Sequence, residues 1–263
     1  MSALYHEVRG RECGRDLVLL HGWGLNLRVW DGLVRELTPR FRVITIDLPG
    51  HGRSDWDPRA STPAAQAWRV HETLAPLTTR YALLGWSLGG QFALDLSAAL
   101  PAGIERLALI ATTPRFLAAP NWRCGTPRPL LARLAHRVHA EGERAVNDFL
   151  ALQVRGSAPR TAARVLAKLR EALARHGAAC PEALMSGLVR LRDGDLRAAL
   201  PMVQVPALVM AGQRDRIIRP AASRALAAAL PRAQYVEVAG AGHAPFLSHP
   251  LQFARRLAGF LCG

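Results

Sequence analysis

Lysine is almost missing from this chain of 263 residues, and it has no long apolar runs or paired cysteines. No apolar run approaches the ~18 residues that a membrane span needs, so we expect no membrane partner. The four cysteines are too scattered for a zinc site or a disulfide framework; they are Cys13, Cys124, Cys180 and Cys262. Unpaired thiols indicate a reducing compartment, and the first 15 residues lack the apolar core of a secretion signal. We therefore expect a cytoplasmic protein that holds no metal.

Acidic residues are also scarce, because 20 aspartates and glutamates face 34 lysines and arginines, which gives a net charge of +14. Lys168 is the only lysine, so one interpretation is a compositional bias toward arginine. The other is an acidic partner, which a basic surface would attract. The sequence contains no basic tail, zinc-finger spacing or aromatic–basic strand pattern, so we expect no nucleic-acid partner.

Short, continuous apolar runs recur along the chain, with helical stretches between them. They lie at residues 17–20, 43–46, 81–84, 107–110, 207–210 and 235–238. Uninterrupted apolar runs of this length are typical of parallel strands that are covered on both faces. The pattern predicts an α/β fold with a mostly parallel, doubly wound sheet.

One interruption, residues 114–196, lacks strand patterns and contains amphipathic helical stretches. One stretch has apolar residues at helical spacing from Ala162 to Leu173, and we expect Ser157 to cap it. An insertion between two parallel strands lies at their carboxyl ends, where ligands bind in this fold class. We predict one core, residues 1–113 and 197–263, that carries a helical lid, residues 114–196.

The motif GWSLG, centred on Ser87, follows a predicted strand directly and precedes a predicted helix. This context is typical of a nucleophile elbow, a turn so tight that glycines flank the serine. An acid and then a histidine should follow in the chain, each after a later strand, and Asp215 and His243 do so. Other candidates fit less well by position; they are Asp95, Asp193, Asp195 and His249. We predict a catalytic triad of Ser87, Asp215 and His243.

The oxyanion of a tetrahedral intermediate needs two hydrogen-bond donors. One is the backbone N–H of Leu88, directly after the serine. We assign the other to the backbone N–H of Trp23 in the loop HGWG, residues 21–24. His21 and the glycine-rich turn of residues 47–54 are interpreted as scaffold.

Several stretches together resemble the α/β-hydrolase superfamily and, at finer grain, the pimeloyl-[acyl-carrier protein] methyl ester carboxylesterases of biotin synthesis. They are LVLLHGWGLN (17–26), DLPGHGRS (47–54), LGWSLGG (84–90), FLALQ (149–153), DLRAALPMVQVP (195–206) and GHAPFLSHP (242–250). The resemblance implies hydrolysis of the methyl ester at the far end of a pimeloyl chain on acyl-carrier protein, with release of methanol and without a cofactor. It also implies substrate contacts at Trp23, Leu88, Phe149, Leu150, Ala151, Leu152, Gln153 and His243.

An acidic carrier would suit the charge of the predicted lid, because residues 115–175 hold 12 basic and 4 acidic residues. Arg160 and Arg164 share one helix face, and like charges at that spacing cost a helix roughly 0.2–0.5 kcal/mol per pair. We predict carrier docking on Arg144, Arg160 and Arg164, with a solvated arginine-rich face as the alternative. A general short-chain carboxylesterase and a non-catalytic binding protein of the same fold also stay open. We expect a monomer.

Overall fold

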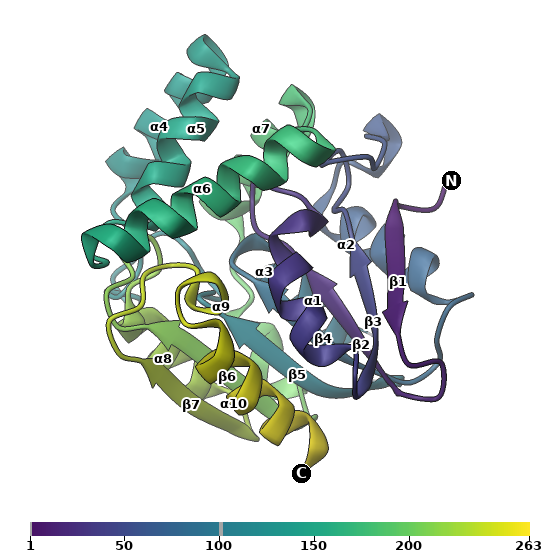
Figure 1. Cartoon of the computed structure of the whole chain (residues 1–263). Helices are drawn as coiled ribbons and strands as arrows, with labels where there is room; N and C mark the ends of the chain where they lie inside the picture. The colour runs from purple at the N-terminus through teal and green to yellow at the C-terminus, as the bar shows by residue number, and fades with distance from the viewer. Residues whose placement is uncertain (1, 100–101) are drawn as a thin grey trace.

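The computed structural model describes residues 2–99 and 102–263, in which helices cover both faces of a seven-stranded sheet (Figure 1). The strands are β1 (His6–Gly10), β2 (Arg15–Leu20), β3 (Phe41–Ile46), β4 (Tyr81–Trp86), β5 (Ile104–Ile110), β6 (Ala207–Gly212) and β7 (Ala233–Val238). Their order across the sheet is β1-β3-β2-β4-β5-β6-β7. Only β1 is antiparallel to its neighbour among the described strands. The predicted α/β fold with a mostly parallel sheet is confirmed.

The edge strand β1 is the one strand for which the sequence analysis had no prediction. All of its residues are partly or fully exposed, and it pairs with β3 alone. A strand without a buried face has no apolar run, so the pattern that indicated the six others was missing here.

Each face of the sheet has its own buried cluster, because successive residues of a strand point to opposite sides. Val18 and Leu20 belong to the cluster under α2, α3 and α8, whereas Leu17 and Leu19 belong to the cluster under α1 and α10. These helices are α1 (Asp31–Leu37), α2 (Pro63–Leu74), α3 (Leu88–Ala99), α8 (Pro220–Ala229) and α10 (Pro250–Cys262). Short elements complete the core: η1 (Leu27–Trp30), η2 (Pro58–Ala60), η3 (Arg197–Met202) and α9 (Pro245–Ser248).

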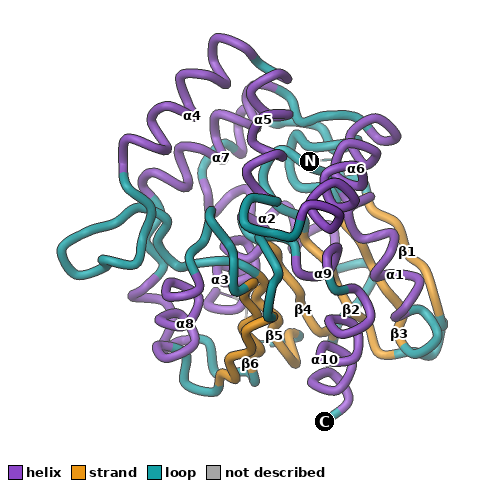
Figure 2. Tube along the Cα trace, turned by 60° about the vertical axis from the view of Figure 1, so that its left-hand side comes forward, coloured by secondary structure: helices purple, strands orange, loops and turns teal. Residues whose placement is uncertain are grey.

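Residues 114–196, which we call the helical insertion, form four helices between β5 and β6. They are α4 (Arg128–Glu141), α5 (Glu143–Gln153), α6 (Pro159–His176) and α7 (Pro181–Asp193). Figures 1 and 2 show them gathered at one end of the molecule, above the sheet. The two ends of the insertion meet, because Leu196 N–H donates to the Pro114 carbonyl at 2.9 Å. The division into core and lid stays a prediction, and the hydrogen bond between the two ends of the insertion supports it.

The helix α6 packs on the core through the face that the sequence indicated. Its buried residues include Val165 and Leu169, and the stripe ends at His176. The prediction that Ser157 caps α6 was wrong, because Ala158 is the N-cap and no side chain bonds there. Ser157 instead lies against the loop at Gly242, where an added Cβ would come within 3.0 Å of its Oγ. Within the described ranges, no helix has both the length and the apolarity to cross a membrane.

Candidate active site

Ser87 lies on a sharp turn between β4 and α3, with a backbone φ of 55°. Non-glycine residues rarely adopt a positive φ, and the cost is of order 1–3 kcal/mol. The turn is closed by its neighbours: a Cβ on Gly85 would lie 2.3 Å from the Gly89 carbonyl oxygen. A Cβ on Gly89 would lie 2.4 Å from the carbonyl oxygen of Leu20. Both glycines of the motif are therefore required by close backbone packing, and the serine side chain is left partly exposed.

His243 and Asp215 lie beside the serine in a continuous line of hydrogen-bonding groups. His243 Nε2 is 3.0 Å from Ser87 Oγ, and His243 Nδ1 is 2.7 Å from Asp215 Oδ2. The loops after β6 and β7 supply the two residues, which are almost completely buried. The structure thus brings together the three residues that the sequence singled out.

The acid is held by backbone donors, which set the tautomer of the histidine. Asp215 Oδ1 accepts the N–H groups of Ile217 and Ile218, at 2.8 and 3.0 Å. The carboxylate therefore turns Oδ2 toward His243, whose Nδ1 donates to it and whose Nε2 is left to accept the serine proton. The backbone of His243 is also fixed, because Gln153 O accepts its N–H at 3.1 Å. This arrangement can activate a serine hydroxyl for attack on a carbonyl carbon.

The competing acids and the competing histidine lie in other contacts. Asp95 forms an ion pair with the buried Arg190. Hydrogen bonds from Arg197 and Arg115 hold the pKa of Asp195 well below its usual range. His249 bonds to the hydroxyl of the preceding residue, at 2.9 Å. None of these contacts involves Ser87.

The two backbone groups proposed for the oxyanion lie on either side of Ser87. Leu88 is the first residue of α3, and the first N–H groups of a helix have no partner within it. Trp23 lies in the loop after β2, and a Cβ on the adjacent Gly22 would be 3.3 Å from Ser87 Cβ. The loop therefore runs against the serine.

His21 holds that loop through hydrogen bonds to Gly22 and Leu48, and neither of its ring nitrogens bonds to Ser87. The Leu48 N–H donates to His21 Nε2 at 2.9 Å, so Nδ1 carries the proton and donates to the Gly22 carbonyl at 2.8 Å. Burial lowers the pKa of His21 well below its ordinary value, which keeps the ring neutral. Its position fits the scaffold role expected from the sequence.

A mostly apolar cavity of about 330 Å³ opens between α4, α5 and the loop after β6. Phe149 and Leu152 line it, and Phe149 also packs edge-on against the indole of Trp23, with ring centroids 5.0 Å apart. Leu150 is instead fully buried in the core cluster under α1 and α10. Gln153 is buried and contributes its backbone carbonyl to His243, while Ala151 is only partly covered. The segment predicted to contact substrate thus faces the cavity with only part of its side chains.

The arginines predicted to bind a carrier lie in different surroundings. All three are exposed, but the Arg164 guanidinium also donates to the Ser248 carbonyl at 2.8 Å. The sequence analysis overlooked a second group of arginines at the cavity: Arg133, Arg137, Arg155 and Arg216. Arg133 and Arg137 are four residues apart on α4, which is the signal that could have indicated them.

Residues 17–256 match the model of the alpha/beta hydrolase family. The chain is 44% identical to the pimeloyl-[acyl-carrier protein] methyl ester esterase of Xanthomonas oryzae pv. oryzae, over 94% of this chain and 95% of that relative. It is 39% identical to the protein of the same name from Nitrosomonas europaea, over 96% and 97%. A solved hydrolase from Pseudomonas aeruginosa superposes with a TM-score of 0.83 at 27% identity, over 98% of this chain and 94% of the other. An enol-lactonase from Burkholderia xenovorans gives a TM-score of 0.82 at 28% identity, over 99% and 96%.

The crowding at the serine turn predicts opposite effects for two glycine substitutions in helices. Gly89→Ala forces the backbone apart, so the free energy of unfolding should fall by about 1–3 kcal/mol. Gly259→Ala in α10 is the matched control, because nothing beyond the backbone of its own helix lies within 4 Å of its added Cβ. Alanine favours a helix, so this control should gain roughly 0.5–1 kcal/mol. Urea unfolding measures both, and equal changes in the two variants would contradict the packing described for Gly89.

Proposed function

The chain belongs to the alpha/beta hydrolase family, and we propose that it is a serine carboxylesterase that hydrolyses the methyl ester of pimeloyl-[acyl-carrier protein]. The observation that carries the chemistry is the line of contacts from Ser87 Oγ through His243 to Asp215. The substrate is proposed from the relatives, because two that carry this name match nearly the whole chain at 39% and 44% identity.

In the proposed reaction, Ser87 Oγ attacks the carbonyl carbon of the ester while His243 Nε2 takes the serine proton. The backbone N–H groups of Trp23 and Leu88 stabilise the oxyanion of the tetrahedral intermediate. His243 then gives its proton to the departing methoxide, so methanol leaves and an acyl-enzyme remains. A water molecule, deprotonated by His243, hydrolyses that acyl-enzyme and releases the free carboxylate. Asp215 orients the imidazole throughout.

The cavity beside Phe149 supports an extended acyl substrate. Its lining is mostly apolar, and it opens at the half-exposed Leu130 and Leu152. Phe149 in its wall packs on Trp23 beside the serine, so we place the methylene chain of the substrate along this cavity. A carrier protein is too large to enter, and it must dock outside. The excess of basic residues on the helical insertion supports an acidic carrier there. The monomeric state, the cytoplasmic location and the lack of a nucleic-acid partner stay predictions from the sequence.

Comparing two substrates tests the function directly. Methanol release from the carrier-bound pimeloyl methyl ester should proceed with a much higher kcat/KM than from free dimethyl pimelate. Equal values for both would favour the general short-chain carboxylesterase.

Ser87→Ala should abolish turnover and leave the fold intact, because alanine fits the turn but has no nucleophile. Removing a triad residue lowers the rate by roughly 10⁴–10⁶-fold. Steady-state rates and circular dichroism of the purified variant check this, with Asp215→Asn expected to lose almost as much activity. Retention of more than about a tenth of wild-type activity by Ser87→Ala would reject Ser87 as nucleophile.

Charge reversal on the helical insertion should weaken the use of the carrier and leave the chemistry intact. Exposed charge contacts are worth about 0–1 kcal/mol each, so Arg144→Glu with Arg160→Glu should raise KM for the carrier-bound ester roughly three- to tenfold. Hydrolysis of a small free ester should stay within about twofold, because surface charge does not act on the serine. Adding Arg164→Glu also removes the hydrogen bond to Ser248, so this triple variant is measured separately.

The matched control makes the same charge change at the amino ends of the strands, opposite the ends that carry the insertion. Arg40 and Arg232 are exposed and directly precede β3 and β7, so they lie far from the strand ends that carry the insertion. Arg40→Glu with Arg232→Glu should leave both substrates unaffected. An equal rise in KM in this control would assign the effect to net charge, and no rise in either variant would place the carrier elsewhere.

A further inference from the structure

The loop of residues 21–27, which carries the proposed oxyanion donor Trp23, is held by three helices of the insertion. The Trp23 indole N–H donates to the Leu184 carbonyl of α7 at 2.9 Å, and its ring packs on Phe149 of α5. The Asn26 amide donates to the Ala172 carbonyl in α6 and to the Gly177 carbonyl just after it, at 2.9 and 2.8 Å. The position of this loop therefore depends on how the insertion is seated.

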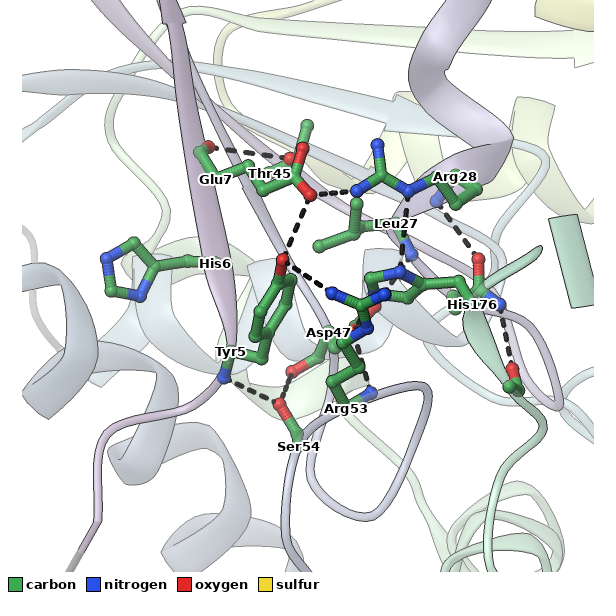
Figure 3. A network of polar contacts seen from close by, with 12 residues as sticks. Tyr5, His6, Glu7, Leu27, Arg28, Thr45, Asp47, Arg53, Ser54 and His176 are labelled. Atoms are coloured by element: carbon green, nitrogen blue, oxygen red, sulfur yellow. Dashed lines mark hydrogen bonds and ion pairs between the residues drawn. The ribbon is translucent and has the colours of Figure 1, made fainter.

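His176, the last residue of α6, adds a further connection through a buried carboxylate (Figure 3). Asp47 is fully buried at the end of β3, and its Oδ1 accepts the Leu27 N–H at 2.7 Å. Its Oδ2 accepts the Arg53 N–H at 2.9 Å and lies 2.7 Å from His176 Nε2. Asp47 thus joins the end of α6 to the end of the Trp23 loop by short hydrogen bonds on its two oxygens.

The surroundings of His176 fix which nitrogen makes that bond. Arg28 Nε lies 3.4 Å from His176 Nδ1 and can only donate, so Nδ1 accepts and Nε2 carries the proton toward Asp47. Arg28 is itself oriented by an ion pair with Glu7 of β1. Tyr5 packs its ring edge-on against the imidazole, with centroids 5.1 Å apart. His176 is buried and engaged on both nitrogens, so it acts on the reaction only through its neighbours, and the shorter of its two contacts is the one to Asp47, which also holds Leu27.

We propose that His176 is a positioning residue which, through Asp47 and Leu27, holds the Trp23 loop so that its backbone N–H meets the oxyanion. The proposal rests on the serine esterase chemistry proposed above. A donor displaced by about 1 Å can cost on the order of 100-fold in rate, so a small movement of the loop is sufficient. The contacts that seat α6 on the core are then the same ones that hold the oxyanion loop. They are the hydrogen bonds of Asn26 to the end of α6 and the link from His176 through Asp47 to Leu27.

The test separates the hydrogen bond of His176 from its volume. His176→Leu keeps the bulk and removes the donor, whereas His176→Gln can place its Nε2 near that of the imidazole. Arg175→Ala is the matched control: it removes exposed ion pairs of the neighbouring residue with Glu171 and Asp31 and leaves Asp47 untouched. Each variant is assayed on a 4-nitrophenyl ester and for inhibition by butylboronic acid, whose tetrahedral adduct with the serine places an oxygen at the oxyanion donors.

We expect His176→Leu to lower kcat by roughly 10–100-fold with little change in KM, because the lost stabilisation belongs to the transition state. The inhibition constant of the boronic acid should rise by the same factor as kcat/KM falls. His176→Gln should recover activity to within about threefold of wild type, and Arg175→Ala should match wild type. An inhibition constant does not depend on how much of the sample is active, so a merely structural role would leave it unchanged.

A kcat within about twofold of wild type in His176→Leu would overturn the proposal. So would a lower kcat with an unchanged inhibition constant, since that result reports lost active enzyme. If His176→Leu does not fold, His176→Asn, whose amide is too short to reach Asp47, carries the same comparison. Turnover of the 4-nitrophenyl ester without turnover of the carrier-bound ester would refute the proposed substrate and leave the His176 comparison intact.

Discussion

Ser87 keeps its positive φ because no side chain occupies Gly85 or Gly89, and the positions of the other site groups follow from that turn. The close approach of Gly89 to the Leu20 carbonyl brings the start of α3 against the end of β2. The Trp23 loop therefore begins beside the serine, and Leu88 opens α3 on its other side. The loops after β6 and β7 reach the same edge because those strands are parallel to β4.

Two histidine–aspartate pairs flank the Trp23 loop, and their surroundings explain why they act differently. Both have a nitrogen–oxygen distance of 2.7 Å, and both carboxylates also accept backbone N–H groups. The second nitrogen of His243 faces Ser87, which is partly exposed, whereas that of His176 faces Arg28. A free acceptor beside a hydroxyl can move a proton, while an imidazole between a guanidinium and a carboxylate can only hold its neighbours in place.

The sequence was sufficient for the six parallel strands and the line from Ser87 to Asp215, because continuous apolar runs and short turn motifs are local signals. β1 was missed since its pairing with β3 comes without a buried face. The wrong cap at Ser157 arose because its side chain lies against Gly242, in a segment that no local pattern connects with it. His176 has its partner 129 residues away at Asp47, so no spacing rule could have joined the two.

The helical insertion leaves and rejoins the sheet at almost the same point. Its ends are joined by the hydrogen bond from Leu196 to Pro114 and by the ion pair of Arg115 with Asp195. The strands β5 and β6 pair directly beneath this junction, so their register does not depend on what the intervening 80 or so residues do. A different insertion could therefore replace this one without disturbing the sheet, but it would have to supply again the contacts that Leu184 and Gln153 make with Trp23 and His243.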